Sequence, residues 1–238
     1  IDSVDNFGEI IAENADGNDQ GGANAFHIAG IVGFSTATED TQHFVTISDC
    51  SNEGNMTSAT CRTSGICAAA NRRTKMVNCI NKGNQLNSCP GPDKGRIANI
   101  ACNVANVSSM TGCVNYGDII STTSARTAGI ANLSNNCEFT NCANYGNVQS
   151  DNKYRGLFWA YNNGLASWSS CVAGGTVGTY NDGKGVADEY TDAAKVNYLG
   201  VQGASKTTLN DITYLIGGKD PEPPVESNAK LKTLFIGN

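Results

Sequence analysis

Apolar and polar positions recur along the first 180 residues in a fixed order that has no helical period. Residues 110–119 read Met-Thr-Gly-Cys-Val-Asn-Tyr-Gly-Asp-Ile, and residues 139–148 repeat them as Phe-Thr-Asn-Cys-Ala-Asn-Tyr-Gly-Asn-Val. Periods of about 20 to 50 residues are typical of solenoids and propellers. The glycine that marks the motif recurs after gaps of 46, 29, 34, 29 and 29 residues, at Gly8, Gly54, Gly83, Gly117, Gly146 and Gly175.

Four columns of residues accompany this glycine. A large apolar residue stands seven positions before it, at Ile1, Ile47, Met76, Met110, Phe139 and Trp168. Four positions before it stand Val4, Cys50, Cys79, Cys113, Cys142 and Cys171. Two positions before it stand Asn6, Asn52, Asn81, Asn115 and Asn144, with Ala173 as the exception. Two positions after it stand Ile10, Met56, Ile119, Val148 and Val177, with Gln85 as the exception.

A glycine-isoleucine motif lies between successive copies and supplies another apolar position. Each period thus holds three short apolar segments bounded by turn-forming residues, which predicts strands, because no segment has the i, i+3, i+4 spacing of a helix. The apolar residues of this motif are Ile31, Ile66, Ile100, Ile130 and Leu157.

Stacking of such coils turns every column into a ladder along one axis. We therefore expect an all-β, right-handed parallel β-helix with three strands per coil over residues 1–180. Residues 181–238 are expected to form a C-terminal cap of the same domain, with a final strand at 231–236, because a solenoid must cover its open strand edge. A propeller blade needs a longer period, and a leucine-rich repeat needs a leucine consensus that is absent. The Asn and Gly columns are expected to adopt positive φ, with the stacked amides bonding along the axis.

The ten cysteines divide into an interior set and a possible bridge. Column cysteines on stacked coils would lie about 4.8 Å apart, longer than the Cβ separation of a disulfide. We expect them to form an interior thiol ladder, with disulfides within the column or a metal as the alternatives. Cys67 and Cys102 are also expected inside, Cys61 and Cys89 are the best candidates for a disulfide, and Cys137 has no evident partner.

Composition narrows the function classes. The net charge of −6 argues against nucleic acid as a partner, since phosphates require Lys and Arg. No run of 18 apolar residues could span a membrane, and no signal peptide is present. Because Ile1 begins inside a repeat, we expect a mature or trimmed fragment whose upstream part is missing.

The repeat resembles those of a known group of bacterial proteins. Residues 128–131, Ala-Gly-Ile-Ala, followed by Cys142-Ala-Asn-Tyr-Gly-Asn-Val148, resemble the repeats of GLUG-type surface proteins, in particular the Cys-x-Asn-x-Gly-x-Ile repeats of secreted lipoproteins and adhesins of Bacteroides-like bacteria. The likeness covers residues 1–180. It implies a cell-surface or extracellular location, with an outer-membrane lipid anchor as one form, and it transfers no catalytic residue.

Motifs of chemistry are sparse. His27 and His43 form no metal-binding pair, and residues 14–19 resemble the start of a calcium loop but lack its later ligands, so no metal or other cofactor is expected. A polysaccharide lyase or glycosidase is the alternative to a binding protein. The densest basic cluster, Arg72, Arg73 and Lys75, has no acidic residue near it in sequence, and the candidate carboxylates are Asp49, Glu53 and Asp118.

Aromatic residues suggest a binding surface instead. Phe7, Tyr116 and Tyr145 share the position between the Asn and Gly columns, where the rings either cover the turn or stack on a ligand. Tyr154, Trp159 and Tyr161 form a second aromatic group that could face outward. We therefore expect a non-enzymatic structural or adhesive module for a host or matrix protein or glycan. The oligomeric state is left open.

Overall fold

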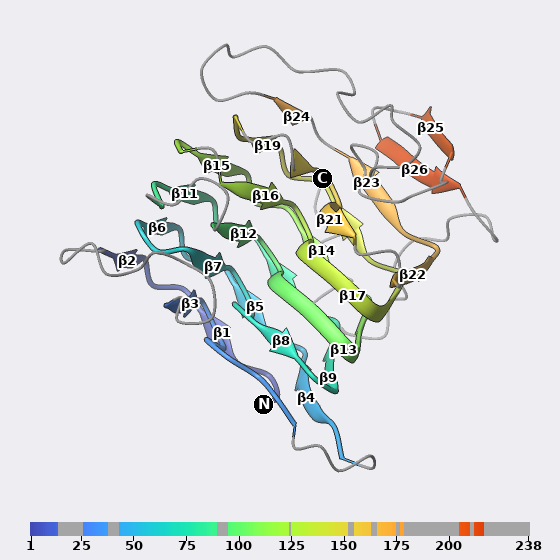
Figure 1. Cartoon of the computed structure of the whole chain (residues 1–238), viewed down its shortest axis with the longest axis horizontal. Helices are drawn as coiled ribbons and strands as arrows, with labels where there is room; N and C mark the ends of the chain where they lie inside the picture. Colours follow the sequence, from blue (N-terminus) through green and yellow to red (C-terminus); the bar gives the residue numbers. More distant parts are fainter. Residues whose placement is uncertain are drawn as a thin grey trace.

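The computed structural model describes residues 1–13, 26–37, 43–89, 95–123, 125–151, 155–162, 166–174, 177–178, 205–209 and 212–216. Every regular element in these residues is a β-strand, and the strands stack coil upon coil along one axis (Figure 1). Pairing between coils is parallel throughout, apart from two antiparallel pairings at the C-terminal end. The predicted parallel β-helix is confirmed.

The strands form four sheets, named A to D here. Sheet A holds β4 (Val45–Ser48), β9 (Thr74–Val77), β13 (Ala101–Thr111), β17 (Ala131–Thr140) and β21 (Trp159–Asn162), with β8 (Ala70–Asn71) paired to β13 and β22 (Ala166–Ser169) to β17. Sheet B holds β1 (Asp5–Asn6), β5 (Ser51–Asn52), β10 (Ile80–Asn81), β14 (Val114–Asn115), β18 (Ala143–Asn144), β23 (Val172–Gly174), β26 (Ile212–Ile216) and β25 (Ser205–Leu209). Sheet C holds β2 (Ile10–Ala12), β6 (Met56–Ser58), β11 (Gln85–Asn87), β15 (Ile119–Ser121), β19 (Val148–Gln149) and β24 (Val177–Gly178). Sheet D holds β3 (His27–Ala29), β7 (Arg62–Ser64), β12 (Arg96–Ala98), β16 (Arg126–Ala128) and β20 (Arg155–Gly156).

The coil has four strand positions, whereas the sequence predicted three. Most sheet B strands have two residues, fewer than the four to eight by which an apolar run identifies a strand. The glycine-isoleucine segments are corners rather than strands: β7 ends at Ser64, and Gly65 and Ile66 bend toward sheet A. Their isoleucines nevertheless face the core, with Ile66, Ile100 and Ile130 fully buried. The handedness of the coil stays a prediction.

The predicted interior columns form one continuous core. Ile47, Met76, Met110 and Phe139 are in register on neighbouring strands of sheet A and are fully buried. The exception in the sheet C column, Gln85, is also buried, and its Nε2 donates a hydrogen bond to the carbonyl oxygen of Ala98 at 3.0 Å. This hydrogen bond offsets part of the cost of burying the amide inside the coil.

The Asn column forms the predicted amide ladder. Each Nδ2 donates to Oδ1 of the Asn on the next coil, over 2.7–2.9 Å, through Asn6, Asn52, Asn81, Asn115 and Asn144. Positive φ does not occur in this column, contrary to the prediction. It occurs three positions earlier, at Ser3, Asp49, Asn78, Gly112, Asn141 and Ser170.

The column glycines are needed for close approach instead. A Cβ on Gly54, Gly83, Gly117 or Gly146 would overlap the carbonyl oxygen of the glycine on the preceding coil. These positions therefore require glycine because neighbouring coils pack closely there, and not because the backbone is left-handed.

The cysteines lie as predicted, and all ten are in described residues. Cys50, Cys79, Cys113, Cys142 and Cys171 are buried without disulfides, so the thiol ladder is confirmed. Cys67 and Cys102 are buried inside the fold. Cys61 and Cys89 form a disulfide between neighbouring coils, with Cα atoms 5.2 Å apart.

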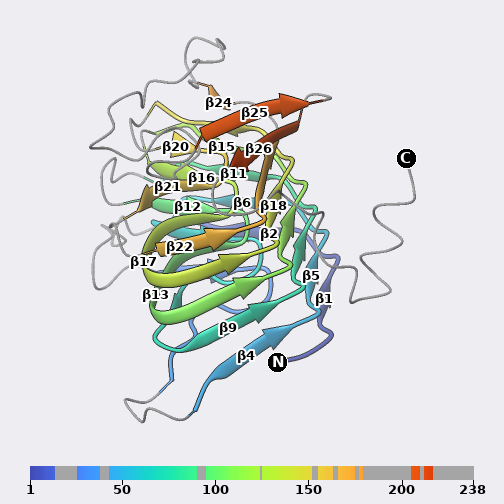
Figure 2. The same ribbon diagram turned by 90° about the vertical axis from the view of Figure 1, so that its right-hand side faces the viewer.

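The predicted cap region contributes two described strands. β26 pairs antiparallel with β23, and β25 pairs antiparallel with β26, so sheet B continues past the last parallel strand (Figure 2). The predicted strand at 231–236 and the calcium-like loop at 14–19 lie outside the described residues. Among the described residues, no helix is long and apolar enough to cross a membrane.

Candidate functional site

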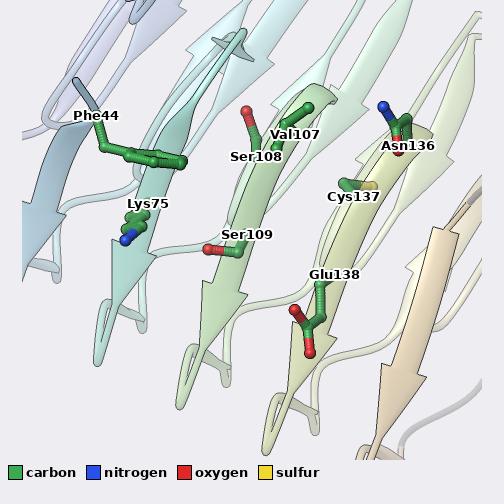
Figure 3. Close-up of a pocket in the computed structure, with 8 residues that line it drawn as sticks. All are labelled: Phe44, Lys75, Val107, Ser108, Ser109, Asn136, Cys137 and Glu138. Atoms are coloured by element: carbon green, nitrogen blue, oxygen red, sulfur yellow. The ribbon is translucent and has the colours of Figure 1, made fainter. Parts of the chain in front are cut away.

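A groove of about 340 Å³ runs across the outer face of sheet A (Figure 3). It crosses β9, β13 and β17 and is bordered by Phe44, just before β4. We call it the sheet A groove, and it is lined by Phe44, Lys75, Val107, Ser108, Ser109, Asn136, Cys137 and Glu138.

The strand pattern explains the row of polar side chains along the groove. Residues alternate between the two faces of a strand, so burial of Met76, Met110 and Phe139 turns their preceding neighbours outward. Those neighbours are in register, Lys75 with Ser109 and Ser109 with Glu138. Two steps between strands separate Lys75 from Glu138, about 10 Å along the axis. The groove thus has a cationic and an anionic end on one flat sheet.

Phe44 provides the aromatic wall of the groove. The residue is 37% exposed, and Lys75 Nζ lies 4.1 Å from the centroid of its ring. Arg73 Cζ lies 5.7 Å from the same centroid. Cations over a ring face are attracted by its quadrupole, so these contacts position both basic side chains beside Phe44.

A bulge in β13 shapes the other wall. The pairing of β13 with β17 shifts between Ala105 and Ser108, so Asn106 and Val107 together face Asn136. Val107 has φ +67° and is 49% exposed, which is an unusual state for a β-branched residue. Bulges re-aim side chains, and backbone strain of this kind concentrates at functional sites. The bulge projects Val107 over the groove.

A second hollow adjoins the groove at this bulge and is more basic. It has a volume of about 280 Å³ and shares Val107 and Asn136 with the groove. Its other lining residues are Arg72, Arg73 and Asn106. The two hollows together carry three cationic side chains and one carboxylate, in a chain of net charge −6.

The basic part of this site follows from the sequence, whereas its acidic residue does not. The basic cluster of Arg72, Arg73 and Lys75 is evident from the sequence, but no acidic residue lies near it in the sequence. Glu138 reaches the groove because two coil steps of 34 and 29 residues separate it from Lys75. The same column alignment that identified the core, applied to the position before it, would have found the pair.

The predicted aromatic column is only partly assembled. The rings of Tyr116 and Tyr145 stack with centroids 5.3 Å apart and an interplanar angle of 19°. Both residues are half-buried. Burial is the larger cause, and electrostatic interaction with Tyr145 the smaller one, that raises the pKa of Tyr116 above its usual range. Phe7 is 71% exposed, but its ring does not stack with the two tyrosines. Two coils separate Phe7 from Tyr116, and at the same repeat position these coils carry Glu53 and Lys82, which form an ion pair at 2.8 Å. The binding role of these three residues stays a prediction.

The second predicted aromatic group does not face outward as a set. Trp159 is fully buried, with its ring centroid 4.9 Å from that of Phe139 and 5.3 Å from that of Phe158. It is in register with Ala131 of the core, so it fills the interior column at this level. Tyr154 lies outside the described residues.

Another set of basic side chains is stacked on sheet D. Arg62, Arg96 and Arg126 are in register on neighbouring strands, and all three are half-buried. Burial, with the charges of Arg62 and Arg126, lowers the pKa of Arg96 to about 10. Arg62 Nη1 lies 2.8 Å from His27 Nε2. The His27 ring in turn packs edge-on against the exposed ring of Phe34, with centroids 5.2 Å apart.

The number of carboxylates that line the groove bears on the reactions it could support. Acid–base hydrolysis of a glycoside uses two carboxylates about 5 to 9 Å apart, and Glu138 is the one carboxylate among the groove's lining residues. Within the described part of the chain, no group of three or more His, Cys, Asp or Glu residues is arranged to hold a metal ion. The groove offers an aromatic ring, charged groups and hydroxyl groups for contact with a ligand.

Comparison of the chain with known protein families, with curated proteins and with solved structures finds no match.

Proposed function

We propose that the protein is a non-enzymatic adhesive module of the cell surface or extracellular space, which binds its ligand in the sheet A groove. The observation that carries the proposal is the exposed Phe44 ring beside Lys75, followed by Ser109 and Glu138 on the next two strands of the same sheet. Solenoids bind through extended sheet surfaces, because stacked coils present side chains at regular steps. Aromatic rings in such places add rigid apolar contact area.

The charge of the groove favours an anionic glycan as the ligand. Arg72, Arg73 and Lys75 outnumber the single carboxylate, Glu138, in the two adjoining hollows. Guanidinium and ammonium groups bind carboxylate and sulfate oxygens, while an aromatic ring packs against the apolar face of a sugar. An acidic segment of a matrix protein is the other ligand that the test must distinguish.

Two observations support an extracellular location. The Cys61–Cys89 disulfide is typical of proteins that reside in oxidising compartments. The Cys-x-Asn-x-Gly repeats resemble those of exported surface proteins, some of which are anchored by a lipid.

The experiment is a glycan and matrix-protein array probed with the wild type and the double variant Phe44→Ala/Lys75→Gln. Both side chains are exposed, so the melt should change little while binding to acidic glycans weakens by about tenfold or more. Added salt should also weaken binding, because the groove acts through partly exposed charges.

Two control variants make this test specific. Arg96→Gln removes a basic residue of sheet D and should leave binding unchanged. Tyr116→Ala/Tyr145→Ala tests the predicted tyrosine surface. If this variant loses binding while the Phe44 variant keeps it, the contact surface is the tyrosine pair and the groove assignment is wrong. If the wild type binds acidic matrix proteins but not glycans, the ligand is an acidic protein segment and not an anionic glycan.

A carbohydrate-active enzyme is the second candidate, favoured by one observation. Lys75 and Glu138 lie in one groove on one sheet, as a base and an acid of a polysaccharide lyase would. Release of reducing ends or of unsaturated products from acidic polysaccharides by wild type, lost in Glu138→Gln, would establish this function in place of adhesion.

A further inference from the structure

The sheet A groove contains one charge that opposes a purely anionic ligand. Glu138 is exposed at the β17 end of the groove, whereas the exposed Lys75 lies at the β9 end. A ligand with negative charge along its whole length would bring anionic groups close to the Glu138 carboxylate. Like charges placed side by side across an interface weaken binding. The groove therefore sets a condition on its ligand beyond acidity.

The two charges of the groove are too far apart to neutralise each other. The strand positions of Lys75 and Glu138 differ by two steps, about 10 Å, which is close to the screening length of salt at about 0.1 M. The Lys75 ammonium group lies against the Phe44 ring, 4.1 Å from its centroid, and not against Glu138. Each charge is thus available to a different part of a bound ligand.

The residue between the two charges is short and leaves room for a ligand. Ser109 pairs in register with Lys75 on one side and with Glu138 on the other, and it lies between them in Figure 3. The neighbouring Ser108 is buried, and its hydroxyl group donates a hydrogen bond to the Ala105 carbonyl oxygen at 2.7 Å. Ser109, in contrast, precedes a buried core position and faces outward. It forms a floor over which a sugar chain can pass from one charge to the other.

We infer that the groove selects a zwitterionic glycan, in which a sugar with a free amine is joined to one with a carboxylate or sulfate. The anionic group binds Lys75, with Arg73 beside it, and the ammonium group binds Glu138. The sugar that carries the anion packs against Phe44, because that ring lies at the Lys75 end. This inference rests on the proposed function and adds to it the second charge of the ligand and its direction along the solenoid axis.

Charge complementarity favours this ligand over one with charges of a single sign. A polyanion is attracted by Lys75 and repelled by Glu138. A polycation is attracted by Glu138 and repelled by Lys75, and also by Arg72 and Arg73 of the adjoining hollow. A ligand with both charges, about 10 Å apart, is attracted at both ends. Glu138 thus serves specificity in two ways, because it attracts an amine and disfavours uniformly acidic chains.

The test compares three forms of one polysaccharide in which uronic acid and amino sugar alternate. The amino group is acetylated, free or sulfated, so the same position is neutral, positive or negative. Wild type should bind the free-amine form about fivefold more tightly than the acetylated form, and the sulfated form most weakly.

Three variants assign this preference to one carboxylate. Glu138→Gln should remove it, and Glu138→Lys should reverse it in favour of the sulfated form, a gain of binding that also requires a folded protein. Glu9→Gln is the matched control, because it removes an exposed carboxylate that does not line the groove. This variant should keep the wild-type preference.

The outcomes separate this inference from the proposed function. If wild type binds the sulfated form as tightly as the free-amine form, or if Glu138→Gln keeps the preference, the inference is wrong while adhesion to acidic glycans stands. If no form binds, or if Phe44→Ala/Lys75→Gln binds all three as wild type does, the proposed function fails and the inference fails with it. Binding of a peptide of mixed acidic and basic residues, without binding of any glycan, would overturn the inference and assign the groove to a protein segment.

Discussion

At the scale of single residues, the fold is held by side chains that serve two coils at once. Asn81 is fully buried, and its Nδ2 donates to the Gly83 carbonyl at 2.8 Å and to Asn115 Oδ1 at 2.9 Å. One bond closes the turn of its own coil, and the other fixes the register of the next. Because a buried amide is costly unless its hydrogen bonds are made, the column admits few other side chains.

The buried thiols predict a loss of stability at alkaline pH. Burial raises the pKa of Cys67 and of Cys102 to about 12. In the thiol ladder, the hydrogen bond with Cys142 and, after it, burial raise the pKa of Cys113. A thiol in the unfolded chain ionises near pH 8.5, so above this pH the unfolded state loses protons that the folded state keeps. The stability is therefore complete below about pH 8.5 and falls as the pH rises toward 12.

Denaturant unfolding across this pH range measures the effect. The double variant Cys67→Ala/Cys102→Ala should show a shallower loss than wild type, because two of the shifted groups are removed. Native alkylation should also spare Cys79, Cys113 and Cys142, which become reactive on unfolding without reductant. A flat pH profile, or rapid native labelling, would show that the thiols are not held inside.

At the scale of strands and turns, the sequence gives the columns reliably but not the local geometry. The spacing from the glycine predicted the core positions Met110 and Ile130 and the thiol ladder, because burial in a stacked coil repeats with the period. It missed sheet B, most of whose strands are two residues long, and it assigned positive φ to the wrong column. A glycine needed for close approach and a glycine needed for positive φ have the same signature in sequence.

The turn glycines provide the prediction at this scale. In Gly83→Ala the new Cβ would overlap the Gly54 carbonyl oxygen and lie 2.8 Å from Asn52 Nδ2, so a coil must shift. We expect a loss of at least about 2 kcal/mol in the free energy of unfolding. Gly8→Ala is the matched control, since its Cβ would lie 3.6 Å from Asn6 Oδ1, an ordinary contact, and should stay within about 0.5 kcal/mol. Equal costs in urea titrations would contradict the packing role.

At the scale of the whole molecule, the site depends on stacking and not on local sequence. Lys75 and Glu138 share a groove because they lie two coils apart in register. The bulge at Val107 arises because β13 has one more residue than β17 between paired positions. A single sequence shows neither a bulge nor the exposure of a ring, so the groove could not be predicted from the motifs, while its basic residues could.

Position along the axis should also decide the effect of a mutation. Met110 and Ile1 occupy the same column, but Met110 has coils on both sides and is fully buried, while Ile1 is 57% exposed. Met110→Asp would bury a charge without a partner and should cost more than about 3 kcal/mol. Ile1→Asp leaves the carboxylate in water and should cost less than about 1 kcal/mol. Thermal and urea melts of the two variants measure the difference, and similar losses would mean that the column does not face one core.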